Sequence, residues 1–396
     1  MSEPWLSIIG IGEDGLAGLS DGSRLALARA RHVFGGPRHL ALAQVGHRGQ
    51  AWPVPFDVAP VLALRGQPGQ TVAVLTSGDP FWFGAGGSLC AHLSHGEWLA
   101  FPAASTFSLA AARLGWRLEA AHCFGLHATE FAHSRTALHP GQRLICLMRD
   151  GAAAGDYARW LVAQGFAGSR LWVLEALGGP HERIRETTAQ AYAFTDVQAP
   201  VALALEAAGA AGLPRSAGLP DADFAHDGQI TKAPVRALTL AALAPRPGER
   251  LWDIGAGSGS ISVEWCLAGG QAIAVEQDAQ RVLNIQANVQ SYGLSHALTV
   301  RHGQAPEALE GLAPPQAIFV GGGFNAALFE VLQALAPRGC RLVVNAVTLE
   351  SESTLLQLHA QQGGELLRIE LARAAPLGRM RGWVPSRPVL QWCTAL

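Results

Sequence analysis

The chain has 396 residues, with 29 Lys and Arg against 31 Asp and Glu and a formal net charge of -2. At about 100–200 residues per domain, this length predicts two or three domains and excludes a single small module. Without excess positive charge the chain lacks the electrostatic footprint of nucleic-acid binding. Charged residues make up only 15% of the chain, below the roughly 25% of ordinary soluble domains, which predicts large cores and little disorder.

The cysteines and histidines give no metal or disulfide pattern. The six cysteines contain no C-x-x-C pair, which favours reduced thiols. His122, His127, His133 and His139 fit no metal-ligand spacing, so we expect no metal. The N-terminus has no basic n-region, and no apolar stretch reaches the about 18 residues of a membrane span. These observations predict a cytoplasmic protein without membrane segments.

In the first half, short apolar runs alternate with segments of helical propensity, which indicates a parallel α/β sheet. Residues 5–11 and 71–75 are predicted strands, and residues 20–30 form a predicted helix. The strand at 71–75 leads into the polar loop Thr-Ser-Gly-Asp-Pro, which contains Gly78 and Asp79. Ligands of open α/β sheets bind at the carboxyl ends of strands. An ordinary turn is the alternative, because Gly-Asp-Pro is favourable turn chemistry by itself.

Two hydroxyl residues, Ser105 and Thr106, stand where a further helix is predicted to begin, and helix capping alone would explain them. Together with the Gly-x-Gly end of the first strand, the Ser-Gly-Asp-Pro loop, Phe-x-Phe-Gly-x-Gly and a late strand at 200–204, they resemble the tetrapyrrole methylase family, in its precorrin C5-methyltransferase branch, over about residues 5–206. The resemblance implies a two-lobed fold that binds S-adenosylmethionine, with Gly78, Asp79, Ser105 and Thr106 at the cofactor site.

One segment departs from this branch. Where the branch usually carries Ser-Leu-His-Gly-Arg, this chain has Gly-Leu-His-Ala-Thr at 125–129. His127 matches, but the roles of the serine and the arginine cannot be carried over, so the substrate contacts of this half stay open. Small residues with Gly and Pro then predict a linker at 209–222, between domains at 1–208 and 223–396.

In the second half, a predicted strand runs into a G-x-G-x-G turn at Gly255, Gly257 and Gly259, followed by a predicted helix at 261–267. Such a turn lets a ligand approach a helix N-terminus closely. The next predicted strand ends in Glu276, 21 residues beyond Gly255, where a carboxylate can accept from ribose hydroxyls. A dinucleotide fingerprint would need glycine at position 260, which is serine. The pattern therefore favours S-adenosylmethionine over NAD, and an NAD-dependent oxidoreductase is the alternative.

Lys232 is the only lysine in the chain, and we interpret it as retained for function, with chance as the alternative. It lies in Asp-Gly-x-Ile-Thr-Lys, which with Asp-Ile-Gly-Ala-Gly-Ser-Gly, Gly-x-Ala-Pro-Glu-Ala-Leu, Phe-Val-Gly-Gly-Gly and Asn-Ala-Val-Thr-Leu-Glu resembles the precorrin C15-methyltransferase and decarboxylase branch of class I methyltransferases, over about residues 223–396. The resemblance implies a Rossmann-like fold and a set of cofactor-binding residues. They are Thr231, Asp253, Gly255, Ala256, Gly257, Ser258, Gly259, Glu276, Gln304, Ala305 and Gly321.

The two halves together resemble the fused enzymes of cobalamin biosynthesis that methylate and decarboxylate a precorrin. This implies methylation of precorrin-6Y at carbon 5 by the first half and at carbon 15 by the second, with loss of the ring C acetate carboxyl, giving precorrin-8X. A carboxylate-rich substrate calls for arginine. Five arginines cluster near the C-terminus: Arg368, Arg373, Arg379, Arg381 and Arg387. We take Lys232, Asn345, Arg379 and Arg381 as candidate catalytic residues, with a solvated basic edge as the alternative for the arginines.

The resemblance also implies a homo-oligomer that takes a small-molecule tetrapyrrole, without nucleic acid or membrane as partner. A methyltransferase acting on RNA or protein is the nearer alternative, but it leaves the first half without a purpose. A noncatalytic sensor built on degenerate methylase domains is a further alternative, against which the intact glycines and Glu276 argue in the second half.

Overall fold

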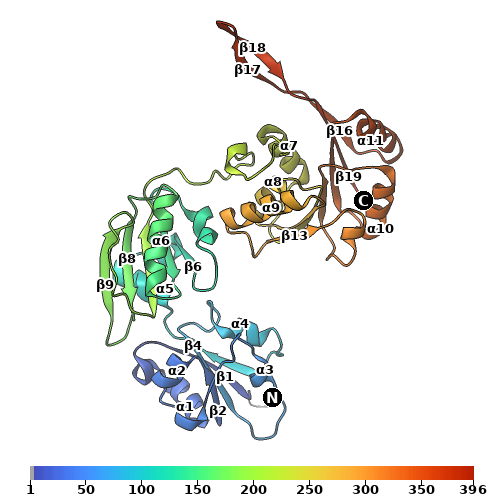
Figure 1. Cartoon of the computed structure of the whole chain (residues 1–396). Coiled ribbons are helices and arrows are strands. Elements are labelled where there is room, and N and C mark those ends of the chain that lie inside the picture. Colours follow the sequence, from blue (N-terminus) through green and yellow to red (C-terminus); the bar gives the residue numbers. More distant parts are fainter. Residues whose placement is uncertain (1–3) are drawn as a thin grey trace. The chain divides into compact units, whose positions relative to one another are not determined.

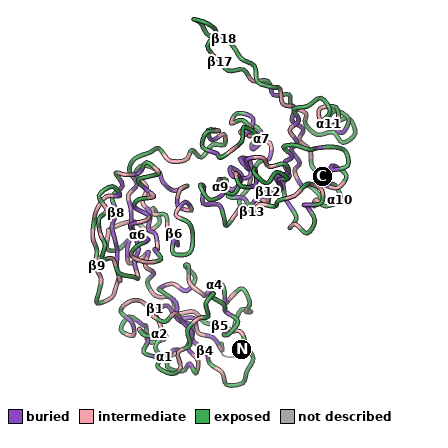
Figure 2. Tube along the Cα trace, in the orientation of Figure 1, coloured by how far each residue is buried: buried purple, intermediate pink, exposed green. Residues whose placement is uncertain are grey.

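The computed structural model describes residues 4–396, and the contacts between them divide the chain into two units. The first unit comprises Met1–Phe131 and Ala137–Gly212, and the second comprises Ala132–Thr136 and Leu213–Leu396. In each unit the buried residues follow the strands, while the outer helix faces and loops are exposed (Figures 1 and 2). No helix within 4–396 is both long enough and apolar enough to cross a membrane.

The first unit begins with a parallel five-stranded sheet in the order β3-β2-β4-β1-β5. Its strands are β1 (Leu6–Ile11), β2 (His32–Gly35), β3 (Gly49–Ala51), β4 (Val72–Ser77) and β5 (Trp98–Phe101). Its helices are α1 (Asp21–Arg29), α2 (Pro37–Leu42), α3 (Ala59–Leu62) and α4 (Ala85–Cys90). Successive residues of β1 enter different cores, Ile8 one and Ile9 the other, because side chains alternate across a strand. The predicted strands at 5–11 and 71–75 and the helix at 20–30 are confirmed.

A second five-stranded sheet, in the order β6-β7-β10-β8-β9, completes the first unit. Its strands are β6 (Ala121–Gly125), β7 (Arg143–Leu147), β8 (Arg170–Glu175), β9 (Arg183–Thr188) and β10 (Val201–Glu206), with α5 (Thr106–Leu114) and α6 (Gly151–Ala163) as its helices. Here the expectation of a parallel sheet is wrong, because β10 runs antiparallel to both β7 and β8. A buried strand is a continuous apolar run in either direction, so the sequence at 200–204 carried no information on its direction.

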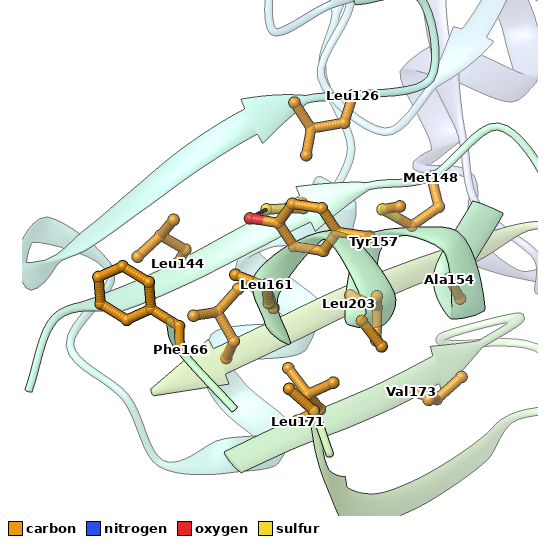
Figure 3. Close-up of a cluster of buried hydrophobic side chains, with 14 of the residues drawn as sticks. Leu126, Leu144, Met148, Ala154, Tyr157, Leu161, Phe166, Leu171, Val173 and Leu203 are labelled. Atoms are coloured by element: carbon orange, nitrogen blue, oxygen red, sulfur yellow. Dashed lines mark hydrogen bonds between the residues drawn. The ribbon is translucent and has the colours of Figure 1, made fainter. Parts of the chain in front are cut away.

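Helix α6 covers this second sheet with an apolar face (Figure 3). Tyr157 and Leu161 are fully buried in one cluster with Leu144, Leu171 and Leu203 of the sheet. Each such side chain contributes about 1.5–3 kcal/mol when it leaves water. The cluster therefore holds β7, β8 and β10 together, and the ends of these strands line a cavity of this unit.

The second unit holds a seven-stranded sheet in the order β13-β12-β11-β14-β15-β19-β16. The strands are β11 (Arg250–Ile254), β12 (Gln271–Glu276), β13 (Leu298–His302), β14 (Ala317–Val320), β15 (Arg341–Ala346), β16 (Glu365–Ile369) and β19 (Val389–Ala395). The helices are α7 (Ala233–Leu243), α8 (Ser260–Leu267), α9 (Ala279–Tyr292), α10 (Ala326–Leu335) and α11 (Leu349–Gln362). Strands β11 to β15 are parallel, whereas β19 is antiparallel to both neighbours. Because β12 and β14 lie on opposite sides of β11, the sheet has a topological switch point there, where ligands of such folds bind.

The second unit also carries a separate two-stranded hairpin, β17 (Ala372–Leu377) and β18 (Met380–Pro385). It projects away from the seven-stranded sheet of its own unit (Figure 1). Leu377, Met380 and Trp383 on it are 70–78% exposed. A lone hairpin is marginally stable in water, so these exposed apolar side chains mark a surface that calls for a partner.

The chain enters the second unit through a segment that packs on that unit. Leu219 and Phe224 are buried in its core. The amides of Gly218 and Leu219 donate to the carboxylate of Glu264 at 2.6 and 3.0 Å. Part of the predicted linker at 209–222 is therefore fixed to the second unit, and the domain boundaries remain our prediction.

Candidate active sites

A cavity of about 780 Å³ lies in the second unit at the carboxyl ends of β11, β12 and β14. Most of the predicted site residues of this unit line it: Thr231, Lys232, Gly255, Ala256, Gly257, Glu276, Gln304, Ala305, Gly321 and Asn345. Five predicted residues do not line it: Asp253, Ser258, Gly259, Arg379 and Arg381. The sheet thus brings together chain segments that are up to about a hundred residues apart, because parallel strands end at the same edge.

The glycine turn after β11 has a conformation that other residues rarely adopt. Gly255, Gly257 and Gly259 have φ values of 67, 59 and 70°. A Cβ at Gly255 would lie 3.1 Å from the carbonyl oxygen of Gly322, and one at Gly259 would lie 2.8 Å from the Ile285 side chain. The turn therefore needs glycine, and it places Gly255, Ala256 and Gly257 at the cavity, where the amides of Gly255 and Ala256 donate to the Val275 carbonyl at 2.9 and 3.1 Å.

Glu276 forms a wall of this cavity. Its side chain is buried, and its carboxylate accepts from the amide of Gly257 at 2.8 Å and from the amide of Asp278 at 3.0 Å. These two bonds use part of the capacity of a carboxylate, which can accept about four hydrogen bonds. The remaining capacity suits a pair of ligand hydroxyls, as the sequence predicted for this position.

Asp253 lies behind the glycine turn. It is fully buried, and its Oδ2 accepts from the amide and the hydroxyl of Ser262 at 3.2 and 2.7 Å. Within residues 4–396 its Oδ1 has no hydrogen-bond partner. Burial, offset in part by the Ser262 hydrogen bonds, raises the pKa of Asp253 to about 6. The geometry gives Asp253 a role in holding α8 behind the turn, so a direct contact with the cofactor stays a prediction.

A strap leading into α7 closes one side of the cavity and carries Thr231 and Lys232. The Arg236 guanidinium is fully buried and donates to Glu264 Oε1 at 2.6 Å and to the Thr231 carbonyl. The Lys232 ammonium lies 3.8 Å from Asp221 Oδ2, and the side chain is half-exposed. Arg236 therefore anchors the strap, while Lys232 places a half-exposed cation at the cavity.

Asn345 lines the cavity, but its amide group is already engaged. Its Nδ2 donates to the Thr239 hydroxyl at 2.9 Å, and its Oδ1 accepts from Gln391 at 3.0 Å. Arg379 and Arg381 lie on the β17–β18 hairpin, exposed and without an ion pair among the described residues. The structure therefore does not bring the four candidate catalytic residues of this unit together at one point.

Several cavity residues were missed by the sequence analysis. They are Gln229, Arg281, Asn325 and Ser386. Asn325 caps α10 by accepting from the Leu328 amide at 2.9 Å, and a polar residue after Phe-Val-Gly-Gly-Gly was a usable signal. Arg387, one of the five clustered arginines, does line the cavity, whereas nothing local in the sequence separated it from Arg379 and Arg381.

A second cavity, of about 210 Å³, lies within the first unit. It is lined by Gly78, Ser105 and Thr106 from the prediction, and by residues from both sheets, among them Gly12 after β1 and Ala202 on β10. Asp79 does not line it, and its carboxylate instead accepts from the Phe81 amide at 2.8 Å. The Ser105 hydroxyl caps α5 through the Ser108 amide at 3.1 Å. As expected, the helix begins at the Ser-Thr pair.

Gly78 makes the close approach between the two loops possible. Its φ is 55°, and a Cβ there would lie 2.7 Å from Ser105 Cα and 2.8 Å from the Ala104 carbonyl oxygen. Both atoms are backbone, so they cannot move aside as a flexible side chain would. Gly78 therefore allows the loop after β4 to pack against the start of α5.

A polar cluster of Glu13, Arg38, His39 and Ser77 stands at the edge of this cavity. Arg38 forms an ion pair with Glu13, and its Nη2 lies 2.8 Å from both Ser77 Oγ and His39 Nε2. Because a guanidinium can only donate, His39 Nε2 accepts and the imidazole is neutral. Burial and the charge of Arg38 accordingly lower the pKa of His39 to about 4. The cluster is electrostatically balanced before any ligand binds.

No group of three or more His, Cys, Asp or Glu side chains in the described part of the chain is placed to hold a metal ion. His127 lines the cavity of the first unit, and burial lowers its pKa. His127 therefore contributes to the wall of that cavity.

The comparisons with known proteins match both units. Residues 6–193 match the family model of tetrapyrrole (corrin/porphyrin) methylases, and residues 222–395 match a precorrin methyltransferase domain. A precorrin-6Y C(5,15)-methyltransferase (decarboxylating) from a Sinorhizobium species is 48% identical over 98% of this chain and 96% of its own length. The chain belongs to the precorrin-6Y C(5,15)-methyltransferase family. Such tetrapyrrole methyltransferases use S-adenosylmethionine as methyl donor.

Other members and partial relatives agree. A precorrin-6Y C(5,15)-methyltransferase (decarboxylating) from Mycobacterium tuberculosis is 41% identical over 97% of this chain and 98% of its own. A crystal structure of the C-terminal domain of the enzyme from Rhodobacter capsulatus is 59% identical, covers 46% of this chain and all of that domain, and has a TM-score of 0.46. The precorrin-6Y C(5,15)-methyltransferase family thus covers nearly the whole chain, and its tetrapyrrole methylase fold and Rossmann-like methyltransferase fold were both expected from the sequence.

Proposed function

We propose that this chain transfers methyl groups from S-adenosylmethionine to carbons 5 and 15 of precorrin-6Y and removes the ring C acetate carboxyl as carbon dioxide, giving precorrin-8X. The observation that carries the proposal is that each unit contains a cavity lined in part by glycines. The full-length relatives of the chain are named precorrin-6Y C(5,15)-methyltransferase (decarboxylating). The residues predicted from the sequence as cofactor contacts are part of the proposal.

The residues of the cavity in the second unit fit the methyl donor. Its volume of about 780 Å³ lies within the about 300–1,000 Å³ of small-molecule sites. Glu276 supports ribose binding, since its carboxylate is held by two backbone amides and has accepting capacity left. The glycine turn lets the donor approach the backbone closely, because Gly255 and Gly257 carry no Cβ, and Gln304 with Ala305 lines the wall where the adenine would lie.

S-adenosylmethionine supplies an electrophilic methyl group when it is bound. The protein then has to hold a nucleophilic ring carbon in line with that group and exclude water. No strong base is needed for the attack, since an enamine-like ring carbon already carries the electron pair. In the decarboxylation, the electron pair of the broken carbon–carbon bond passes into the protonated macrocycle as carbon dioxide leaves, so no external oxidant or reductant is consumed.

We assign methylation at carbon 15 and decarboxylation to the second unit, and methylation at carbon 5 to the first. Lys232 supports the assignment because its half-exposed cation can bind a substrate carboxylate at the cavity. Arg379 and Arg381 would bind further carboxylates from the hairpin, and Asn345 would orient the cavity wall through Thr239 and Gln391. These roles follow from placement and charge.

We also infer a homo-oligomer in the cytoplasm. The exposed apolar side chains of the β17–β18 hairpin support an assembly of copies, because a second chain would cover them. Light scattering should give a mass above that of one chain, and Trp383→Ser should lower it. A single-chain mass for the unaltered protein would reject the assembly.

The division between the units is tested with donor carrying a ¹³C-labelled methyl group and two variants of the full chain. Gly78→Ala should label only carbon 15, whereas Gly255→Val should label only carbon 5 and leave the carboxyl in place. Gly255→Val places a branched side chain at a φ of 67° beside the Gly322 backbone. The opposite labelling pattern would reject the division while leaving the overall reaction intact.

A further inference from the structure

Phe83, in the loop after β4, has a backbone conformation that is rare for a bulky residue. Its φ is 57°, one of four positive values among the described residues other than glycine, with those of Gln44, Ala176 and Ala244. Positive φ is unfavourable for residues with a Cβ. Strain of this kind persists where the surrounding structure imposes it, and it collects at functional sites. Phe83 lines the cavity of the first unit.

Apolar rings are exposed at this place. Phe81, Trp82 and Phe83 follow one another and are 49, 37 and 54% exposed. They are nevertheless held in place: the Trp82 ring centroid lies 4.7 Å from that of the buried Phe107, and the Phe83 centroid lies 5.9 Å from it. The loop thus presents fixed aromatic surface to solvent at the rim of a cavity, which costs hydrophobic free energy unless a ligand covers it.

A glycine on a neighbouring strand makes room for the Phe83 ring. A Cβ at Gly125, the last residue of β6, would lie 2.9 Å from Cδ1 of Phe83. The His127 ring meets Phe83 edge-on, at 6.5 Å between centroids and 86° between planes. The strained backbone at 83 and the glycine at 125 therefore both serve one ring position.

The size of the cavity decides what can lie against these rings. The cavity has a volume of about 210 Å³. A tetrapyrrole with its acetate and propionate side chains cannot enter such a space and has to lie across its rim. Conjugated rings stack favourably on aromatic side chains in offset or edge-on arrangements. Gly78, Ser105 and Thr106 line the same cavity as Trp82 and Phe83.

We propose that Phe83, supported by Trp82, forms a platform on which the tetrapyrrole macrocycle stacks while the first unit methylates it. The platform is a positioning surface: it holds the ring plane across the cavity so that one ring carbon faces the interior. The inference rests on the proposed function for the identity of the substrate. It adds the surface that selects and orients that substrate in the first unit.

The test is Phe83→Gly in the full chain. Glycine adopts a φ of 57° without strain, so the thermal midpoint should stay the same or rise. The KM for the tetrapyrrole in the carbon 5 methylation should rise at least about tenfold with a smaller change in kcat. The dissociation constant of S-adenosylmethionine and the carbon 15 reaction should stay within about twofold of the unaltered protein. Phe83→Trp should retain most of the affinity because it keeps an aromatic surface.

Gln44→Gly is the matched control. Gln44 also has a positive φ, of 50°, but it is exposed and does not line the cavity. The Gln44→Gly variant should relieve the same kind of backbone strain without changing the carbon 5 or the carbon 15 reaction. An unchanged KM for the tetrapyrrole in Phe83→Gly would overturn the platform. So would a variant that binds S-adenosylmethionine more weakly while its KM for the tetrapyrrole stays the same.

An equilibrium titration followed by the absorbance of the macrocycle separates this inference from the proposed function. If the unaltered protein binds the tetrapyrrole but adds no methyl group at carbon 5, the proposed function fails while weaker binding by Phe83→Gly would still support the platform. If Phe83→Gly and the unaltered protein give the same titration, the platform is wrong whatever the reaction.

Discussion

The two cavities lie at the carboxyl ends of parallel strands, but they are assembled in different ways. The cavity of the second unit is formed at one sheet, largely by the segments that follow β11, β12 and β14. The cavity of the first unit takes residues from two sheets, such as Gly12 from the first and Ala202 from the second. A site at one sheet edge can be built from contiguous motifs, whereas a site shared by two sheets needs residues that are scattered along the chain.

The two cavities also differ in the charged groups that lie near them. In the first, the Glu13–Arg38 pair and the neutral His39 leave a balanced cluster. In the second, two carboxylates are buried near one another, and Asp253 has a raised pKa. The first cavity therefore presents a neutral wall with aromatic rings, and the second presents accepting groups. We expect variants to separate the two sites cleanly.

Among the variants, Gly78→Ala is expected to show the largest difference between the two donor-binding sites. The unaltered chain should bind two molecules of S-adenosylmethionine, and this variant should bind one, because the new Cβ would lie 2.7 Å from Ser105 Cα. Isothermal titration calorimetry measures the stoichiometry. Gly87→Ala in α4 is the control, since its Cβ would meet nothing within 4 Å. Two sites in Gly78→Ala would contradict the account of the first cavity.

Asp253→Asn should reveal the buried carboxyl of the second unit. With a pKa raised from 3.8 to about 6, the folded chain binds this proton more tightly than the unfolded chain. The contribution of Asp253 to stability is therefore present below pH 4 and is lost as pH rises through about 6. Relative to the unaltered protein, the variant should gain about 2 kcal/mol between pH 4 and pH 7.5, since one pKa unit is about 1.4 kcal/mol and part of the transition already lies below pH 4.

Urea unfolding at these two pH values, followed for the second unit, measures that difference. Ser262→Ala is a useful companion, since removing the hydroxyl hydrogen bond that favours the ionised form should strengthen the pH dependence of the otherwise unaltered chain. A stability difference between Asp253→Asn and the unaltered protein that does not change with pH would contradict the assignment.

Glu276→Gln should weaken donor binding at the second site alone. A hydrogen bond to a charged group is worth about 1.5–3 kcal/mol, so the dissociation constant should rise by about tenfold or more. The first site should be unaffected. Glu310→Gln, an exposed position of the same unit outside the cavity, is the control. Equal weakening of both sites in the calorimeter would mean that Glu276 acts through the fold.

The smallest effect is expected from replacing Arg379 and Arg381 together by alanine. Both are exposed on the hairpin, where each charge contributes about 1 kcal/mol or less because water screens it. The KM for the tetrapyrrole should rise a few-fold with unchanged donor affinity. Arg338→Ala, an exposed arginine outside the cavity, should leave the KM unchanged. Unaltered steady-state kinetics in the double variant would reject a substrate role for the hairpin.

The comparison also explains what the sequence could predict. Glu276 was assigned from its place at the end of a strand, because strand, turn and carboxylate are adjacent in the chain. The Glu13, Arg38, His39 and Ser77 cluster was not, because the order β2-β4-β1 brings together three strand ends that are far apart in sequence. Strand order and direction depend on tertiary pairing. The strand at β10 was predicted, but its antiparallel direction was missed for the same reason.

Backbone conformation was the other limit. The glycine turn at 255–259 could be recognised, since glycine is the residue type that a positive φ requires. The positive φ of Phe83 could not, because a bulky aromatic residue rarely adopts that conformation and gives no local sign of it. Local rules identify residues that satisfy them and cannot identify a residue that violates them.

The most direct test of the account is the mass of the tetrapyrrole product after the purified chain is incubated with S-adenosylmethionine and reduced precorrin-6. Two active units predict a product that has gained two methyl groups, each replacing a proton, and has lost one carbon dioxide. A product with one added methyl group, or an unchanged mass with both substrates bound, would contradict the claim that each unit contains a working methyl-transfer site.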